Sequence, residues 1–263
     1  MAFKTFPFLF RVLCACIVLL NSGCDEKRSA SNRANILIMG TSGDLPPFEF
    51  YKTAENKNEM VGFDVELAQR ICQYLGYELQ VKDSDFSAII PALQAGRLDF
   101  AMAGITASEE RKKTVDFSSI YYVTANVLMT IENSDFYKRK AFKGKKIAVQ
   151  LGSTQEQFAR FWASQKPGLE IIALNRIGDI VQELNAKRID GAILEESTAQ
   201  AYIGNNPDIY DITQLQDQQG GMAIAFPKGS SLVKDFERAL QHLRDIGYID
   251  KLIQKWFGAS DRL

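Results

Sequence analysis

The sequence predicts an α/β protein made of two similar lobes, each built around a mostly parallel β-sheet flanked by helices. The body of the chain alternates short β-rich runs with amphipathic helical segments, a pattern typical of parallel sheets. The length of 263 residues fits two lobes of ordinary size. An internal repeat indicates that the two lobes resemble each other.

The repeat consists of residues 90–101 (IPALQAGRLDFA) and residues 181–192 (VQELNAKRIDGA), which align without gaps. In each copy we expect a helix to end, a tight turn through the Arg and the Asp to follow, and a buried strand to begin. Ligands of open α/β sheets bind beyond the carboxyl ends of the strands. The segments that follow the two strands, 103–106 and 194–196, should therefore face each other across a cleft.

Local signals place other elements. A first strand, Ile36–Met39, leads into a loop rich in Gly and Pro. Asp64 is the expected N-cap of an amphipathic helix that ends at Gly76. Residues 147–154 (IAVQLGST) are expected to form a strand, a glycine turn and the start of a helix near Thr154.

The first 24 residues have the character of a secretory signal. Lys4 and Arg11 supply positive charge, and an apolar run, Val12–Leu20, follows. This run is much shorter than the roughly 20 residues that span a bilayer. We therefore expect residues 1–24 to contain a cleaved secretory signal peptide, with Cys24 at its end.

The end of this signal resembles the lipobox of bacterial lipoproteins. Cys24 follows Ser22-Gly23 and would carry the lipid, although Asn21 stands where the motif usually has a leucine. Residues 25–34 are polar and have no apolar periodicity, so we expect them to form a flexible tether.

Composition argues against several classes of function. A net charge of -1 gives no reason to expect a nucleic-acid partner, and the basic run at 138–146 is expected to be a solvated loop. His242 is the single histidine, and Cys72 is the one cysteine beyond position 24. These counts argue against catalytic triads, His-rich metal sites and a disulfide in the body. We expect no catalytic residue, no metal and no cofactor.

Three charged or polar features suit a zwitterion. Arg111 offers a planar fork for a carboxylate, and the helix opening at 152–154 presents N–H groups that favour an anion. Glu195 or Glu196, at the end of a strand, could pair with an ammonium group. Each feature alone has a plainer explanation as a surface or core residue. Together they supply the partners without which both charges of an amino acid could not be buried.

The chain resembles the amino-acid-binding subfamily of bacterial extracellular solute-binding proteins, the receptors of ABC importers. The resemblance covers residues 35–258 and rests on motifs whose order is specific to this family. They are GTSGDLPPFEF, VGFDVELAQRI, DFSAIIPALQAGRLDFAMAGITASEER, VDFS, LGSTQE, LNAKRIDGAILEE and DIGYIDKLIQKWFG.

This resemblance implies the two-lobed type II periplasmic-binding-protein fold, in which a two-segment hinge joins the lobes. One lobe would comprise residues 35–122 and 227–263, and the other residues 127–219. The hinge segments would lie near 122–128 and 220–226.

The resemblance also implies roles in binding. Arg111 would clamp the ligand α-carboxylate, assisted by the backbone N–H groups of Thr106 and Thr154. The Glu195 carboxylate, the Gly104 carbonyl and the Thr106 hydroxyl would meet the α-ammonium group.

Phe86 matches an aromatic residue that packs on the ligand side chain. Leu45 stands opposite it where many relatives have a second aromatic residue. Ser42 occupies a position at which receptors for lysine or ornithine often have an aspartate, and Asp44 could substitute for it. The ligand is therefore arginine or another basic amino acid, or a neutral polar one such as glutamine or cystine.

The resemblance implies a monomer that binds a free L-amino acid and delivers it to the membrane subunits of an ABC permease. It would act in the periplasm or on the extracellular face of the cell membrane, held there by its lipid. Two alternatives remain open. One is an enzyme similar to cyclohexadienyl dehydratase, and the other is a sensing module that signals through a partner.

Overall fold

The structure is a computed structural model that describes residues 35–54, 57–131, 134, 136–204, 210–215 and 220–258. The expected signal peptide with Cys24 and the expected tether lie outside these ranges. Within the ranges, no helix is both long enough and apolar enough to cross a membrane.

The first lobe contains a five-stranded sheet of order β5-β1-β6-β15-β7. β1 pairs in parallel with β5 and β6, whereas β15 runs antiparallel to β6 and β7. These strands are β1 (Ile36–Thr41), β5 (Glu78–Asp83), β6 (Phe100–Ala101), β7 (Val115–Phe117) and β15 (Ala225–Pro227).

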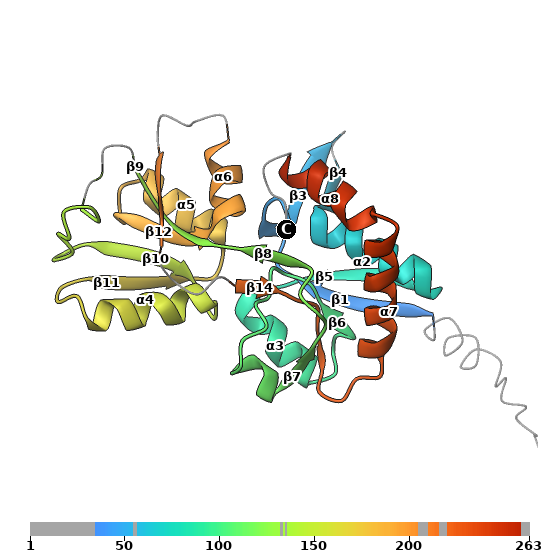
Figure 1. Cartoon of the computed structure of the whole chain (residues 1–263). Helices are drawn as coiled ribbons and strands as arrows, with labels where there is room; N and C mark the ends of the chain where they lie inside the picture. Colours follow the sequence, from blue (N-terminus) through green and yellow to red (C-terminus); the bar gives the residue numbers. More distant parts are fainter. Residues whose placement is uncertain are drawn as a thin grey trace, which may run out of the picture. The chain divides into compact units, whose positions relative to one another are not determined.

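Four helices and a small antiparallel sheet complete this lobe (Figure 1). The helices are α2 (Phe63–Leu75), α3 (Phe86–Gln94), α7 (Leu232–Asp245) and α8 (Tyr248–Phe257). The small sheet joins β2 (Asp44–Leu45), β3 (Glu49–Ala54) and β4 (Lys57–Val61).

The second lobe has a five-stranded sheet of order β11-β10-β12-β9-β13. β10 pairs in parallel with β11 and β12, and β9 runs antiparallel to β12 and β13. The strands are β9 (Asn126–Ile131), β10 (Lys146–Gln150), β11 (Glu170–Leu174), β12 (Gly191–Glu195) and β13 (Tyr210–Gln214). Its helices are α4 (Thr154–Ser164), α5 (Ile177–Asn185) and α6 (Glu196–Ile203).

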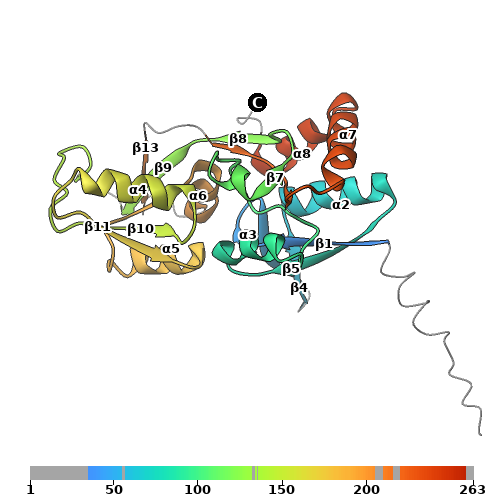
Figure 2. The same ribbon diagram turned by 90° about the horizontal axis from the view of Figure 1, so that it is seen from below.

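The chain passes between the lobes along two extended segments, which Figure 2 shows from a second side. β8 (Tyr122–Thr124) leads from the first sheet to the second, and β14 (Gly220–Met222) leads back. The two strands pair antiparallel to each other. The expected fold, two mostly parallel sheets flanked by helices, is confirmed; the lobe limits and the bending of the hinge remain predictions.

The internal repeat forms the same structure in each lobe. α3 leads to β6, which pairs in parallel with β1, and α5 leads to β12, which pairs in parallel with β10. The Asp99 carboxylate accepts the backbone N–H of Ile38 at 2.7 Å, and the Asp190 carboxylate accepts that of Lys146 at 2.9 Å. The shared Asp therefore ties the start of one strand to its neighbour in both sheets.

The expected N-cap at Asp64 is wrong, because the helix begins at Phe63 and is capped by Gly62. Gly62 has a φ of 138°, and a Cβ there would lie 2.1 Å from the Phe48 carbonyl oxygen. A side chain at this position would collide with backbone. Asp64 instead lies in the first turn of α2 and is fully buried.

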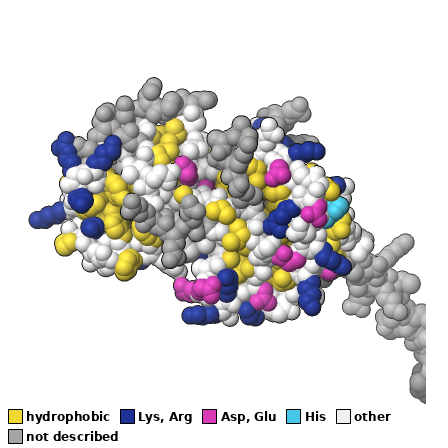
Figure 3. All heavy atoms as spheres, in the orientation of Figure 1, with side chains coloured by type: hydrophobic (Ala, Val, Ile, Leu, Met, Phe, Trp, Pro, Cys, Tyr) yellow, Lys and Arg dark blue, Asp and Glu magenta, His cyan; other side chains and the backbone are white. Residues whose placement is uncertain are grey.

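Apolar side chains from the helices and sheets fill the interior, and Cys72 on α2 is buried among them at 1% exposure. The basic loop at 138–146 is largely exposed, as expected, although Phe142 within it is buried. Figure 3 shows Lys and Arg side chains gathered at the end of the second lobe, where β10, β11 and α4 lie.

Two glycines of positive φ test these backbone constraints. Gly96→Ala should lower the free energy of unfolding by about 1 kcal/mol, since its φ is 65° and a Cβ would meet no neighbour within 4 Å. Gly62→Ala should lower it by roughly 3 kcal/mol or more, because steric collision with Phe48 adds to the strain. Urea denaturation measures both values, and equal losses would contradict the account of Gly62.

Candidate functional site

A cavity of about 1170 Å³ lies between the two lobes, at the carboxyl ends of β6 and β12. Small-molecule pockets typically measure about 300–1,000 Å³, so an amino acid fits with room for water. Residues from both lobes line this cavity. Among them are Phe86, Gly104, Thr106, Thr154 and Glu195, all of which the sequence had indicated.

Gly104 follows β6 and has a backbone conformation suited to glycine. Its φ is 57°, and a Cβ would lie 2.5 Å from the Leu45 side chain. Its N–H donates to the buried Asp64 carboxylate at 3.2 Å. No donor among the described residues reaches the Gly104 carbonyl, which therefore remains available to a ligand.

Arg111 opens a short 3-10 turn, η1 (Arg111–Lys113), beside the cavity. Its Nη1 donates to the Thr106 carbonyl at 3.0 Å, and its Nη2 donates across the lobes to the Gly152 carbonyl at 3.0 Å. The guanidinium carbon lies 5.4 Å from the centre of the Phe86 ring. Burial lowers the pKa of Arg111 to about 10, so the group is still charged at neutral pH.

Thr154 is the first residue of α4, and Ser153 caps this helix by accepting the N–H of Glu156 at 3.1 Å. Backbone N–H groups in a first helical turn lack partners within the helix and favour an anion. Within the described part of the chain, neither the Thr154 N–H nor the Thr106 N–H has an acceptor. The two groups are therefore available to a carboxylate, one from each lobe.

Glu195 lies at the end of β12 and is 3% exposed. Its carboxylate caps α6, accepting the N–H groups of Ser197 at 3.0 Å and Thr198 at 2.8 Å, and it also accepts the Thr124 hydroxyl. Burial raises the pKa of Glu195. A carboxylate can accept about four hydrogen bonds, so roughly one position remains for an ammonium group.

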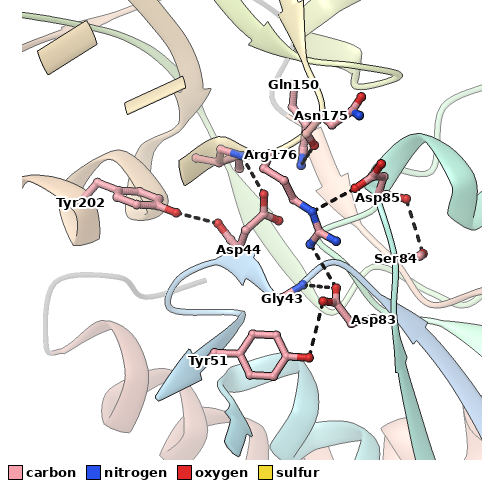
Figure 4. Close-up of polar contacts among 11 residues, drawn as sticks. Gly43, Asp44, Tyr51, Asp83, Ser84, Asp85, Gln150, Asn175, Arg176 and Tyr202 are labelled. Atoms are coloured by element: carbon pink, nitrogen blue, oxygen red, sulfur yellow. Dashed lines mark hydrogen bonds and ion pairs between the residues drawn. The ribbon is translucent and has the colours of Figure 1, made fainter. Parts of the chain in front are cut away.

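Asp44 bridges the lobes and does not line the cavity (Figure 4). Its carboxylate accepts the backbone N–H of Ile177, at the start of α5, at 2.7 Å, and its carbonyl accepts the Tyr202 hydroxyl at 3.0 Å. Burial raises the pKa of Asp44 to about 6. Ser42 is buried next to it and is also absent from the described lining. A ligand contact by either residue stays a prediction.

Arg176 is an inter-lobe residue that the sequence did not reveal. It precedes α5 in the second lobe and reaches two carboxylates of the first, Asp83 at 3.1 Å and Asp85 at 3.0 Å (Figure 4). Asp83 also accepts the Gly43 N–H at 2.9 Å. A usable signal existed, because Arg176 follows the end of a strand just as the cavity-lining segments do.

The lobes also meet at Glu110, the residue that precedes Arg111. The Gln157 amide on α4 donates to the Glu110 carboxylate at 3.0 Å.

His242 lies outside the lining and stacks on Tyr74, with ring centres 4.7 Å apart. Across the described residues, no group of three or more His, Cys, Asp or Glu side chains is arranged to hold a metal ion.

Comparisons with known proteins agree with this architecture. The family model of bacterial extracellular solute-binding proteins, family 3, matches residues 37–259. The arginine-binding extracellular protein ArtP of Bacillus subtilis (strain 168) is 40% identical over 253 residues, which are 95% of this chain and 97% of that protein.

Two solved structures are also similar. The substrate binding protein of an amino acid ABC transporter has 40% sequence identity and a TM-score of 0.79, covering 84% of this chain and 99% of that one. AbpA from Streptococcus pneumoniae, bound to L-arginine, has 32% identity and a TM-score of 0.79, covering 89% of this chain and all of that one (100%). This chain belongs to the bacterial extracellular solute-binding proteins of family 3, in the amino-acid-binding subfamily.

Proposed function

We propose that this protein is the extracytoplasmic substrate-binding component of an ABC importer and that its preferred ligand is L-arginine. The observation that carries the proposal is the arrangement of charges around the inter-lobe cavity. The Arg111 guanidinium is not itself among the lining residues but is bonded to the carbonyl of one of them, Thr106. With the N–H groups of Thr106 and Thr154, which have no acceptor among the described residues, it would favour a carboxylate, and the lining carboxylate of Glu195 would favour an ammonium group. An α-amino acid is a small zwitterion that would pair with both.

The energetic argument favours such a ligand over an uncharged one. A buried ionic group without a partner is prohibitively costly, whereas each charge-assisted hydrogen bond contributes about 1.5–3 kcal/mol. Several such bonds are needed to reach micromolar affinity, which corresponds to about −8 kcal/mol. Arg111, Thr106, Thr154, Gly104 and Glu195 together would supply them.

Arginine is proposed as the ligand because ArtP is named as an arginine-binding protein and the AbpA structure contains bound L-arginine. The Phe86 ring would stack on the guanidinium group of the ligand, since planar cations bind aromatic faces. The amide side chains of Asn126, Gln150 and Gln155 also line the cavity and offer polar partners. Glutamine is the alternative that this lining also accommodates.

Closure of the lobes is the proposed mechanism of capture. The ligand would contact Arg111 and Glu195 together only when the lobes approach, so it binds the closed state more tightly and shifts the population toward it. The segments near 122–128 and 220–226 would act as the hinge. The contacts of Asp44 and Arg176 across the lobes would form in the same movement.

We also propose that residues 1–24 direct secretion and that Cys24 carries a lipid, with 25–34 as the tether. The protein would act as a monomer in the periplasm or on the outer face of the cell membrane and would present its closed form to the permease. It would perform no chemical reaction, in keeping with relatives that are named as binding proteins.

A screen of residues 25–263 against the free amino acids tests the ligand. Arginine at about a thousand times its dissociation constant should add roughly 4 kcal/mol of stability, seen as a higher melting temperature. Prephenate and arogenate belong in the same screen, with product formation as the readout. No shift with any amino acid, or turnover of either compound, would refute the proposal.

Arg111→Ala should weaken arginine binding by about 2–5 kcal/mol, because it leaves a buried carboxylate without its main partner. Arg111→Lys should fall between wild type and Arg111→Ala, since lysine keeps the charge and loses the planar fork. Arg97→Ala, an exposed arginine of the same lobe, is the matched control. Calorimetry measures the three affinities, and a loss of less than about tenfold for Arg111→Ala would contradict its role.

Arg176→Ala should weaken binding by roughly 1 kcal/mol, or about fivefold, because it removes two partly exposed ion pairs that hold the lobes together. Arg188→Ala is the control, since its partner Glu183 is in the same lobe. Double variants with Asp83→Asn and Asp85→Asn should lose less than the sum of the single losses. Equal losses for Arg176→Ala and Arg188→Ala would show that the inter-lobe pairs do not assist closure.

A further inference from the structure

Two carboxyl groups are buried together in the first lobe, and one of them is bonded to the cavity residue Gly104. Glu49, the first residue of β3, and Asp64, in the first turn of α2, are both 0% exposed. Neither oxygen of Glu49 has a hydrogen-bond donor among the described residues, and Asp64 Oδ1 has none either. Two adjacent carboxylates cannot both be ionised in such a site without severe repulsion.

A single proton resolves this arrangement. The side chains of Glu49 and Asp64 are within hydrogen-bonding reach of each other. If Glu49 is protonated, its hydroxyl donates to the orphaned Oδ1 of Asp64, and both groups gain a partner. The other oxygen of Asp64 is already occupied, because Oδ2 accepts the Tyr121 hydroxyl at 2.7 Å and the Gly104 N–H at 3.2 Å.

The last of these bonds connects the pair to the cavity. Gly104 lines the cavity, and its carbonyl is a proposed partner of the ligand ammonium group. A Cβ at Gly104 would lie 2.5 Å from the Leu45 side chain, and its N–H is held by the Asp64 carboxylate. The orientation of the peptide that enters Gly104 therefore depends on the charge and position of the Asp64 carboxylate.

We propose that Glu49 is a neutral acid that shares its proton with Asp64, and that this pair positions Gly104 for ligand binding. Glu49 and Asp64 are then positioning residues, since neither lines the cavity. The stability part of this proposal stands without a ligand. The binding part rests on the function proposed above.

The electrostatic surroundings support a neutral Glu49. Burial raises the pKa of Glu49 well above its usual value. The negative charge of Asp64 is the next cause, and the charges of Asp44 and Asp83 raise it further. Burial raises the pKa of Asp64 to about 6, although the bonds from Tyr121 and Gly104 oppose the shift. Beyond these acids, the phenol of Tyr121 faces the pair and is itself held neutral, chiefly by burial.

The sign of the pH effect follows from proton linkage. The folded protein keeps the Glu49 proton to a higher pH than the unfolded chain, in which Glu49 ionises near pH 4.5. The folded state therefore binds more protons above that pH, and the free energy of unfolding falls as the pH rises. Glutamine at position 49 cannot ionise, so it removes this loss while still donating to Asp64.

The first experiment compares melting temperatures of wild type and Glu49→Gln from pH 5 to pH 8, without ligand. The difference, Glu49→Gln minus wild type, should grow by about 3 °C or more toward pH 8, since one unit of pKa corresponds to about 1.4 kcal/mol. Glu59→Gln, at an exposed residue of the neighbouring β4, is the control with the same Glu-to-Gln substitution and should show no such trend. A difference that stays constant with pH would overturn the shared proton.

Infrared spectroscopy provides an independent readout. Wild type at pH 8 should show the carbonyl stretch of a protonated carboxyl group that Glu49→Gln lacks. Absence of this band from the wild type would contradict a neutral Glu49.

The second experiment measures arginine affinity in Asp64→Ala and Asp64→Asn. Asp64→Ala leaves the Gly104 N–H without an acceptor and should weaken binding about tenfold or more. Asparagine keeps a carbonyl for Gly104 and an amide donor for Glu49, and should restore affinity to within about threefold of wild type. Equal affinities in the two variants would overturn the positioning role. If neither the wild type nor any variant bound an amino acid, the proposed function would be refuted. The melting temperatures of wild type and Glu49→Gln would still test whether Glu49 shares its proton with Asp64.

Discussion

The central physical constraint on this protein is that a buried charge must meet an opposite charge or a full set of hydrogen bonds. In the proposed mechanism the two lobes divide this task. The first lobe would supply the Arg111 guanidinium and the Gly104 carbonyl, and the second would supply the Glu195 carboxylate and the first turn of α4. Neither lobe alone could desolvate a zwitterion at acceptable cost. Binding and closure are therefore a single event in the proposed mechanism.

Much of this arrangement could be predicted from sequence because the two lobes share a local pattern. The Arg-[LI]-Asp turn appears twice, and its Asp has the same structural task in each sheet. Lys187 even adopts the left-handed conformation, φ 55°, that Gly96 adopts in the other copy. Knowing which strands are equivalent locates their carboxyl ends, and those ends carry the cavity residues that follow β6 and β12.

Features created by distant segments could not be predicted in this way. Gly62 caps α2 at a point where the Phe48 carbonyl leaves no room for a side chain. Asp64 is the better N-cap by residue type, but its carboxylate instead accepts hydrogen bonds from the Gly104 N–H and the Tyr121 hydroxyl. Arg176 finds its partners some 90 residues away, at separations of 93 and 91. Local propensity contains no information on such contacts, and a buried carboxyl pair violates the usual polarity of a core.

Titration calorimetry with ligand analogues tests the central claim most directly. For arginine, the matched compounds are agmatine, which lacks the α-carboxylate, and the 2-hydroxy analogue, which lacks the α-ammonium group. If charges from both lobes together neutralise the zwitterion, each analogue should bind about a hundredfold or more weakly than arginine. An analogue that bound within about threefold of arginine would contradict the account, because one of the two buried charges would then need no partner.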